Sequence, residues 1–148
     1  MTLTEILAKE YIKVPLQAKG KNGIIEELVD LLVKNRPSYK KEEILGAVLA
    51  REALGSTGLA DGVAVPHAKT TAVDRIALVM GISPEPVDFK AQDGKGSQLF
   101  FLVLAPEKES SAYIELLASI ARATASPVMR RLMSKASSSD EVLSLLLD

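Results

Sequence analysis

The sequence predicts a single α/β domain in which a central mixed β-sheet is flanked by helices on both faces. Apolar residues recur at helical spacing in several segments, which predicts amphipathic helices. Between these segments lie short, almost continuously apolar runs, as expected of strands that are covered on both faces. The chain has 148 residues, of which 47% are hydrophobic, so it is long enough to bury a sizeable core. We therefore expect residues 1–148 to form one domain.

Two helices are expected in the first third of the chain. Residues 22–35 carry an apolar stripe and stop before Pro37, while residues 44–49 carry the stripe of a second helix. Ser38 is placed to cap this second helix, and Gly55 is placed to end it.

Three shorter helices are expected towards the C-terminus. Their apolar positions lie at 116–120, 128–134 and 140–147. Ser126 and Pro127 stop the first of them, and Ser138 or Ser139 caps the last.

The expected strands are residues 63–65, 76–82 and 99–104. Residues 84–86, with the sequence Pro-Glu-Pro, predict a turn between strands, and residues 106–111 predict a loop. Alternation of such strands with helices favours a sheet held between two helical layers.

Composition narrows the function classes. Lys and Arg total 18 against 19 Asp and Glu, so the net charge of −1 gives no electrostatic reason to expect a nucleic-acid partner. The absence of cysteine excludes disulfides and thiolate chemistry, and we expect neither a metal nor a cofactor. No segment has the pattern of a secretory signal or of a membrane span, which predicts a cytoplasmic protein without direct membrane insertion.

His67 is the only histidine in the chain and the first candidate for chemistry. An imidazole with an ordinary pKa of about 6.5 keeps an uncharged nucleophilic nitrogen at cellular pH. Pro66 fixes its own φ and favours an extended Val65, so His67 is expected at the end of a stiff strand. The alternative is that His67 is only a hydrogen-bonded structural residue.

Arg51 is predicted at the end of a helix, just before the glycine-rich run that precedes His67. Its planar guanidinium suits an anionic oxygen, so Arg51 and His67 could share one anion site.

The pattern Arg-Glu-x-x-Gly-Ser-Thr-Gly-x-x-x-Gly-x-Ala-x-Pro-His, from Arg51 to His67, resembles the active-site signature of a known family. The family comprises the fructose- and mannitol-type enzyme IIA domains of the bacterial phosphoenolpyruvate-dependent phosphotransferase system, together with nitrogen-regulatory IIA-like proteins. Residues 87–94 and 99–106 are similar to later family segments, so the resemblance covers nearly the whole chain.

The resemblance implies that His67 accepts a phosphoryl group from HPr, or from its nitrogen-type relative, and later passes it on. Arg51 would then stabilise the equatorial oxygens of the phosphoryl group. Backbone N–H groups of the glycine-rich turn, Gly58 included, and the hydroxyls of Ser56 and Thr57 could hold the remaining oxygens. The alternative for this turn is a local structural role.

Asp61 occupies a position where related domains can carry an acidic residue. It could hold the ring of His67 or the guanidinium of Arg51. The alternative is that it simply forms a turn ahead of Gly62.

Tyr113 stands where mannitol-type members of the family carry a second histidine. Its hydroxyl could donate a hydrogen bond to a phosphoryl oxygen, or the residue could be an ordinary tyrosine at the edge of the core.

The sequence therefore leaves several function classes. We favour a phosphotransferase-type carrier in a nitrogen-type regulatory branch, whose targets distinguish the two states of His67. The alternatives are a sugar-specific IIA component that passes its phosphoryl group to a IIB domain, and a binding module that works without phosphorylation. A hydrolase with His67 as general base is a weaker hypothesis, because no serine lies in a recognised nucleophile elbow.

Apolar residues near the site could form a rim for a partner or belong to the core. These residues are Leu59, Val63 and Val65.

Overall fold

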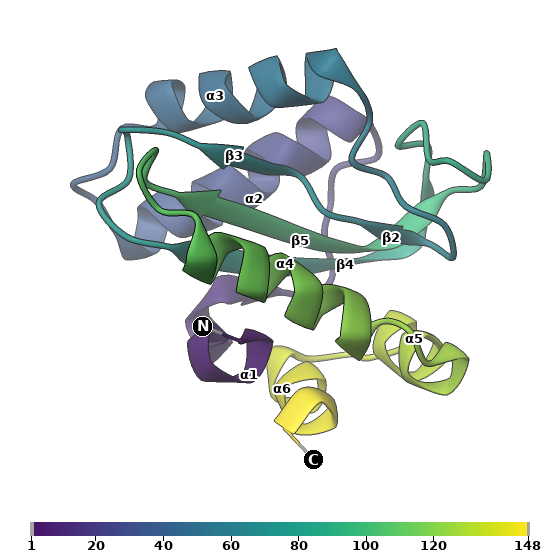
Figure 1. The fold of residues 1–148 in the computed structure, drawn as a ribbon. Helices are drawn as coiled ribbons and strands as arrows, with labels where there is room; N and C mark the ends of the chain where they lie inside the picture. Colours follow the sequence, from purple (N-terminus) through teal and green to yellow (C-terminus); the bar gives the residue numbers. More distant parts are fainter. Residues whose placement is uncertain (1, 148) are drawn as a thin grey trace.

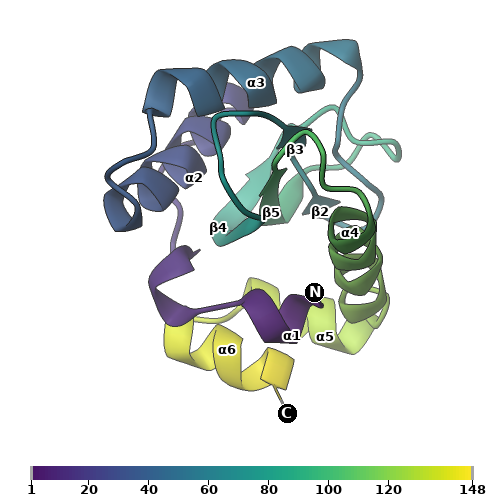
Figure 2. The ribbon, with the colours of Figure 1, turned by 60° about the vertical axis from the view of Figure 1, so that its left-hand side comes forward.

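The computed structural model describes residues 2–147 and has three layers, with a β-sheet between two groups of helices (Figures 1 and 2). In chain order the elements are α1 (Leu3–Ile6), η1 (Lys9–Tyr11), β1 (Ile12–Lys13), α2 (Lys21–Asn35), α3 (Lys41–Leu54), β2 (Val63–Ala64), β3 (His67–Lys69), β4 (Ala77–Val87), β5 (Ser97–Ala105), α4 (Ser111–Ala123), α5 (Pro127–Ser134) and α6 (Ser139–Leu147). Helices α2 and α3 cover one face of the sheet, while α1, α4, α5 and α6 lie on the other side. The predicted fold class is thus confirmed.

The sheet is mixed, with the order β1-β4-β5-β2, and β3 also pairs with β5. Strands β4 and β5 are antiparallel, whereas β1 pairs with β4, and β2 and β3 pair with β5, in parallel. Both β2 and β3 thus lie along the same side of β5. The register places His67 opposite Val103.

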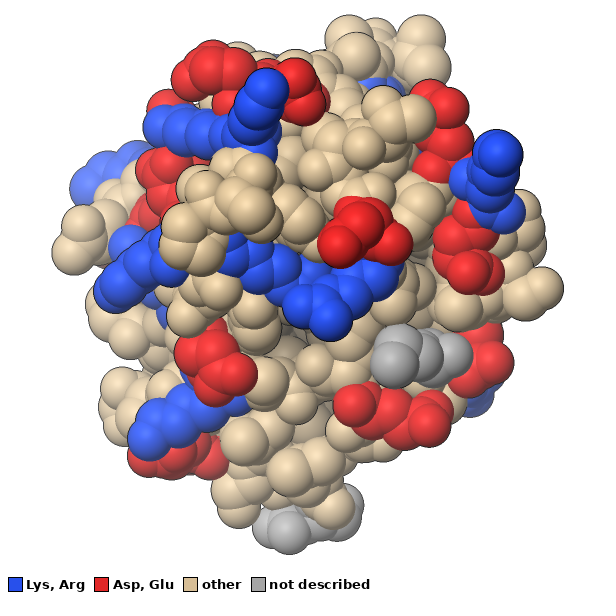
Figure 3. All heavy atoms as spheres, turned by 90° about the vertical axis from the view of Figure 1, so that its left-hand side faces the viewer, with Lys and Arg blue, Asp and Glu red and all other residues tan. Residues whose placement is uncertain are grey.

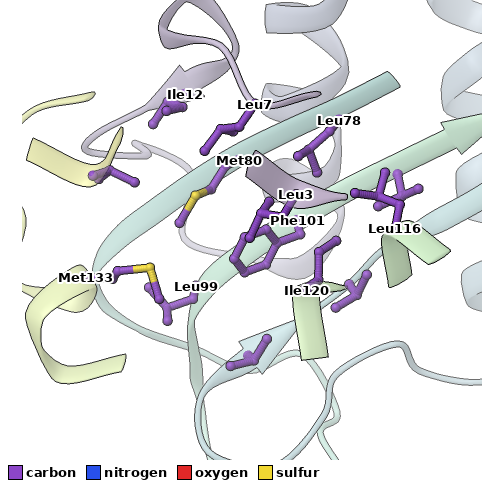
Figure 4. Packing of buried hydrophobic residues seen from close by; sticks show 14 of the residues in the cluster. Leu3, Leu7, Ile12, Leu78, Met80, Leu99, Phe101, Leu116, Ile120 and Met133 are labelled. Atoms are coloured by element: carbon purple, nitrogen blue, oxygen red, sulfur yellow. The ribbon is translucent and has the colours of Figure 1, made fainter. Parts of the chain in front are cut away.

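Successive residues of β5 point to opposite faces and so contribute to two separate cores. Phe101 and Val103 belong to the cluster under α1, α4, α5 and α6, while Phe100 and Leu102 belong to the cluster under α2 and α3. Figure 4 shows the first cluster, in which Leu3 of α1 packs with Phe101 and with residues of α4 and α5. Burial on both faces explains why this strand is continuously apolar.

The expectations for the C-terminal helices are confirmed. The Ser126 hydroxyl accepts a hydrogen bond from Met129 N at 3.2 Å, and Pro127 is the first residue of α5. At α6, the Ser138 hydroxyl accepts from Glu141 N at 3.1 Å, which identifies Ser138 as the capping residue.

The expected cap of α3 is wrong. The helix begins at Lys41, with Lys40 at the N-cap and no side-chain cap hydrogen bond. Ser38 lies two residues too early, in a turn that Tyr39 N closes on Arg36 O at 3.0 Å. Gly55 is the C-cap of α3, as expected, but its φ of 160° is extended rather than left-handed.

The expected turn at residues 84–86 is also wrong, because these residues lie inside β4. The pairing of β4 with β5 shifts between Ile82 and Val87. A bulge of this kind accommodates prolines, which cannot donate to the ladder. The sequence does not predict the short elements α1, η1, β1 and β3.

Charged side chains of both signs are interspersed on the face shown in Figure 3, where a short band of Lys and Arg is bordered by Asp and Glu. Over the residues that the structure describes, this face therefore offers mixed charge. It is not the uninterrupted basic surface that attracts a phosphate backbone. None of the helices within residues 2–147 is long and apolar enough to cross a membrane.

Replacing Phe101 by Ala should lower the free energy of unfolding by about 3–5 kcal/mol, because the ring is fully buried between the sheet and α1. Urea denaturation of the two proteins measures this difference. A loss below about 1 kcal/mol would contradict the packing described for this cluster.

Candidate functional site

His67 is the first residue of β3, and Val65 and Pro66 separate it from β2. Pro66 lacks an N–H, but its carbonyl accepts a hydrogen bond from Val103 N at 3.0 Å. Pairing with β5 therefore continues on both sides of the proline, although Pro66 itself cannot donate a hydrogen bond to β5. The backbone of His67 is fixed on a rigid element, as the sequence predicts.

The imidazole of His67 is half-buried, and its Nδ1 lies 2.6 Å from the carbonyl oxygen of Val65. A carbonyl oxygen can only accept a hydrogen bond, so Nδ1 must carry the proton that it donates. In the neutral ring, Nε2 is then the unprotonated nitrogen. This contact prepares one defined nitrogen for nucleophilic attack.

Arg51 and His67 line the same hollow, which has a volume of about 290 Å³. Arg51 lies in the last turn of α3, and its Nη1 donates to the Gly55 carbonyl at 2.8 Å. Apolar side chains of α4, among them Leu117 and Ile120, also line the hollow. The hollow thus combines a nucleophilic nitrogen with a permanent cation.

Tyr113 lies near the start of α4, only 8% exposed, with its ring centroid 6.0 Å from that of His67. Burial raises the pKa of Tyr113 to about 12, and the positive charge of Arg51 opposes this rise. At neutral pH the phenol therefore keeps its proton and can act as a donor. The structure brings Tyr113, His67 and Arg51 into one neighbourhood.

The two hydroxyls of the glycine-rich turn are directed to other partners. The Ser56 hydroxyl donates to the Phe89 carbonyl at 2.5 Å, and the Thr57 hydroxyl donates to the Glu52 carboxylate. The amide of Thr57 also donates to Glu52, at 3.0 Å, and the amide of Gly58 donates to the Ser56 hydroxyl at 2.9 Å. Each hydroxyl carries one proton, so neither can donate to a phosphoryl oxygen without leaving its present partner.

Asp61 lies in a turn outside the hollow. Asp61 and Gly62 have φ values of 66° and 80°, the left-handed conformation that an Asp-Gly turn favours. The carboxylate lies 3.9 Å from the guanidinium of Arg130, and the Asp61 amide donates to Asp93 at 3.1 Å. These contacts match the turn-forming alternative, whereas the ring nitrogen Nδ1 of His67 is held by Val65 and Arg51 by Gly55.

Of the three apolar residues considered for a rim, two belong to the core. Val63 and Val65 are buried, although Val65 also lines the hollow, and Leu59 is exposed at its edge.

The sequence reasoning missed two charged residues beside the site. The buried Glu52 holds Thr57, and the Nζ of Lys69 lies 5.5 Å from the ring centroid of Tyr113. Both residues stand inside or next to the Arg51–His67 pattern, and Lys69 shares a face with His67 because strand residues two apart point the same way. Within residues 2–147, no cluster of three or more His, Asp or Glu side chains is arranged to hold a metal ion.

Comparison with known proteins identifies the family. The sequence model described as "Phosphoenolpyruvate-dependent sugar phosphotransferase system, EIIA 2" matches residues 5–148. The chain belongs to this family. The resemblance read from Arg51 to His67 is therefore confirmed at the level of the family.

This EIIA 2 chain is similar to both sugar-specific and regulatory proteins. It is 32% identical over 146 residues to the fructose-specific EIIABC component from Bacillus subtilis, an alignment that covers 99% of the chain but only 23% of that longer protein. The structure of nitrogen regulatory protein IIA-Ntr from Neisseria meningitidis matches with a TM-score of 0.88 and 32% identity over 97% of this chain and 98% of that one. The enzyme IIA chain in the complex of mannitol enzyme IIA with phosphorylated enzyme IIB from Escherichia coli matches with a TM-score of 0.80 and 28% identity, covering 95% and 96% of the two chains.

The raised pKa of Tyr113 predicts a pH dependence for this EIIA 2 domain. The pKa is about 12 in the folded chain, against about 10 for an ordinary tyrosine, so the folded state holds the phenolic proton more tightly. The resulting contribution to stability is complete below about pH 10 and is lost as the pH rises towards about 12. Urea denaturation of wild type and Tyr113→Phe between about pH 9 and about pH 11 measures it, and the wild type should lose more stability with rising pH. Parallel curves for the two proteins would show that the phenol is not held in its protonated form by burial.

Proposed function

We propose that the protein is a phosphocarrier in which Nε2 of His67 accepts a phosphoryl group from an HPr-type phosphohistidine protein. The observation that carries the proposal is the hydrogen bond from Nδ1 to the Val65 carbonyl, which leaves Nε2 unprotonated. His67 and Arg51 line one hollow, so the attacking nitrogen and a cation for the phosphoryl oxygens are available together.

The transfer requires one bond to form and one to break. The lone pair of Nε2 attacks the phosphorus of the donor phosphohistidine, while the electron pair of the donor's N–P bond returns to the ring nitrogen of the donor. The proton on Nδ1 of His67 stays on that nitrogen, donated to the Val65 carbonyl throughout, so the new phosphoramidate bond forms without a separate base. The guanidinium of Arg51 would stabilise the equatorial oxygens, and the protonated Tyr113 hydroxyl would supply a neutral donor.

The proposal places the protein in a nitrogen-type regulatory branch. Two observations favour this branch over a sugar-specific one. The match to IIA-Ntr from Neisseria meningitidis is stronger than that to the mannitol enzyme IIA, with a TM-score of 0.88 against 0.80. Tyr113 also lies beside His67, and the family resemblance aligns it with the position where mannitol-type members carry a second histidine. A phosphoryl group on His67 would add a charge of about −1.5 to −2, enough to alter complementarity with a target protein.

The second candidate is a sugar-specific carrier that hands its phosphoryl group to a IIB domain. It is favoured by the 32% identity to the fructose-specific component and by the fold shared with an enzyme IIA solved in complex with phosphorylated enzyme IIB.

Incubation with phosphoenolpyruvate, enzyme I and HPr should add one acid-labile phosphoryl group to the wild type and none to His67→Ala. Intact-protein mass measures the gain, and circular dichroism should show that the variant stays folded, because the half-buried ring fills no core cavity. Absence of a gain with both HPr and its nitrogen-type relative would instead indicate a binding module that works without phosphorylation.

The two branches differ in donor and recipient. A nitrogen-type regulator should be phosphorylated faster by the nitrogen-type donor than by HPr, and the phosphorylated protein should keep its phosphoryl group when a fructose-type IIB domain is added. Quenched-flow sampling with mass detection compares these rates. Rapid transfer to the IIB domain would favour the sugar-specific alternative.

A further inference from the structure

We infer that Glu52 is a positioning residue for His67, acting through a series of hydrogen bonds, linked by the backbone of Thr57 and Val65, that runs from the buried Glu52 carboxylate to the imidazole. The inference rests on the proposed function of His67 as phosphoryl acceptor. Glu52 itself is part of α3 and is not among the residues that line the hollow.

The series begins at a buried carboxylate. The Glu52 side chain is 4% exposed, and its Oε2 lies 2.7 Å from the Nζ of Lys21 at the start of α2. The same carboxylate accepts the amide N–H and the hydroxyl of Thr57. A buried carboxylate is costly unless its oxygens are occupied, so these partners hold Thr57 in one place relative to α2 and α3.

The series continues from Thr57 to the imidazole. The Thr57 carbonyl accepts from Val65 N at 3.0 Å, and the Val65 carbonyl is the group that holds Nδ1 of His67 at 2.6 Å. Val65 follows the last residue of β2, and the register of β2 with β5 pairs Val63 and Ala64 only. Thr57 therefore holds the N–H of Val65, the residue whose carbonyl, on the other side of its Cα, sets the orientation of the His67 ring.

The same loop also reaches Arg51. The guanidinium donates to the carbonyl of Gly55, two residues before Thr57, and the Ser56 hydroxyl anchors the segment between them to Phe89. A shift of Thr57 would thus move the contacts of the nucleophile and of the cation together.

The effect of Glu52 is expected on the rate of transfer more than on donor binding. Phosphoryl transfer depends mainly on position and electrostatics, and a displacement of about 1 Å can cost on the order of a hundredfold in rate. Loss of the Val65 contact would in addition let the neutral ring exchange its proton between Nδ1 and Nε2, so that part of the population presents a protonated Nε2.

Glu27 provides a matched control. Its carboxylate also accepts backbone amides of a loop, from Gln17 and Ala18 at 2.8–3.0 Å, and pairs with a lysine, Lys13, at 2.9 Å. This second carboxylate ties the segment after β1 to α2 and has no link to the His67 contacts. Glu27→Gln should therefore reduce stability without altering the imidazole.

The test measures the tautomer of His67 by long-range ¹⁵N–¹H NMR in the unphosphorylated full chain, at a pH where the ring is neutral. The signal is unambiguous because the chain has one histidine. We expect a single tautomer protonated at Nδ1 in the wild type and in Glu27→Gln, and a mixture in Glu52→Gln. The rate of phosphorylation at saturating phospho-HPr should fall on the order of tenfold to a hundredfold in Glu52→Gln, with little change in the KM for the donor.

A second pair of variants covers the case in which Glu52→Gln does not fold. Thr57→Val removes the hydroxyl that donates a hydrogen bond to Glu52, and this variant should show the same mixture of tautomers as Glu52→Gln. Thr57→Ser keeps a hydroxyl and should show the wild-type signal. A wild-type tautomer and rate in folded Glu52→Gln, or an equal effect in Glu27→Gln, would reduce Glu52 to a structural residue and overturn the inference. Failure of the proposed function would look different, because the wild type would gain no phosphoryl group whatever the tautomer measurement shows.

Discussion

The arrangement of the site depends on the parallel pairing of residues 63–69 with β5. Strand β5 is buried on both faces and lies inside the sheet, so its position is fixed by two cores at once. The edge segment follows it in register on both sides of Pro66, which places His67 opposite Val103 and directs the Val65 backbone groups away from β5. One of those outward groups meets Thr57, and the other meets the imidazole. The sheet thus determines where the ring can lie, and the loop after α3 determines how it is turned.

The parts of the fold that could be predicted are those where burial imposes a period on the sequence. Helix α2 and strand β5 were expected within one or two residues of their ends, because one has a single buried stripe and the other is buried on both faces. The two prolines within β4 led to the wrong prediction of a turn at residues 84–86. The sequence does not show that a bulge interrupts the hydrogen-bond ladder there. The start of α3 was predicted too early because serine is common both at helix N-caps and in turns. Ser38 lies in a turn, which the hydrogen bond from Tyr39 N to Arg36 O closes.

The same limit applies to the site. The motif predicts that Arg51 and His67 lie close together, and in the structure they line one hollow. Tyr113, which the sequence places on a helix, packs beside the imidazole. The hydrogen-bond partner of a hydroxyl could not be predicted. A serine or threonine in a glycine-rich turn gives the same sequence pattern whether its hydroxyl faces a bound anion or a carboxylate of its own chain. The buried Glu52 decides this for Thr57, and burial of an acidic residue has no local sequence signal.

The loop that carries Thr57 also closes the edge of the sheet. Residues 57–59 run antiparallel to residues 63–65, with Gly58 bridged to Ala64 and Leu59 N donating to Val63 O at 2.7 Å. An exposed edge would invite a further strand, from another copy of the chain or from an extended peptide, to add to the sheet. Here the Val63 carbonyl and the Val65 amide already have partners in the loop, so β-augmentation beside His67 would require the loop to be displaced.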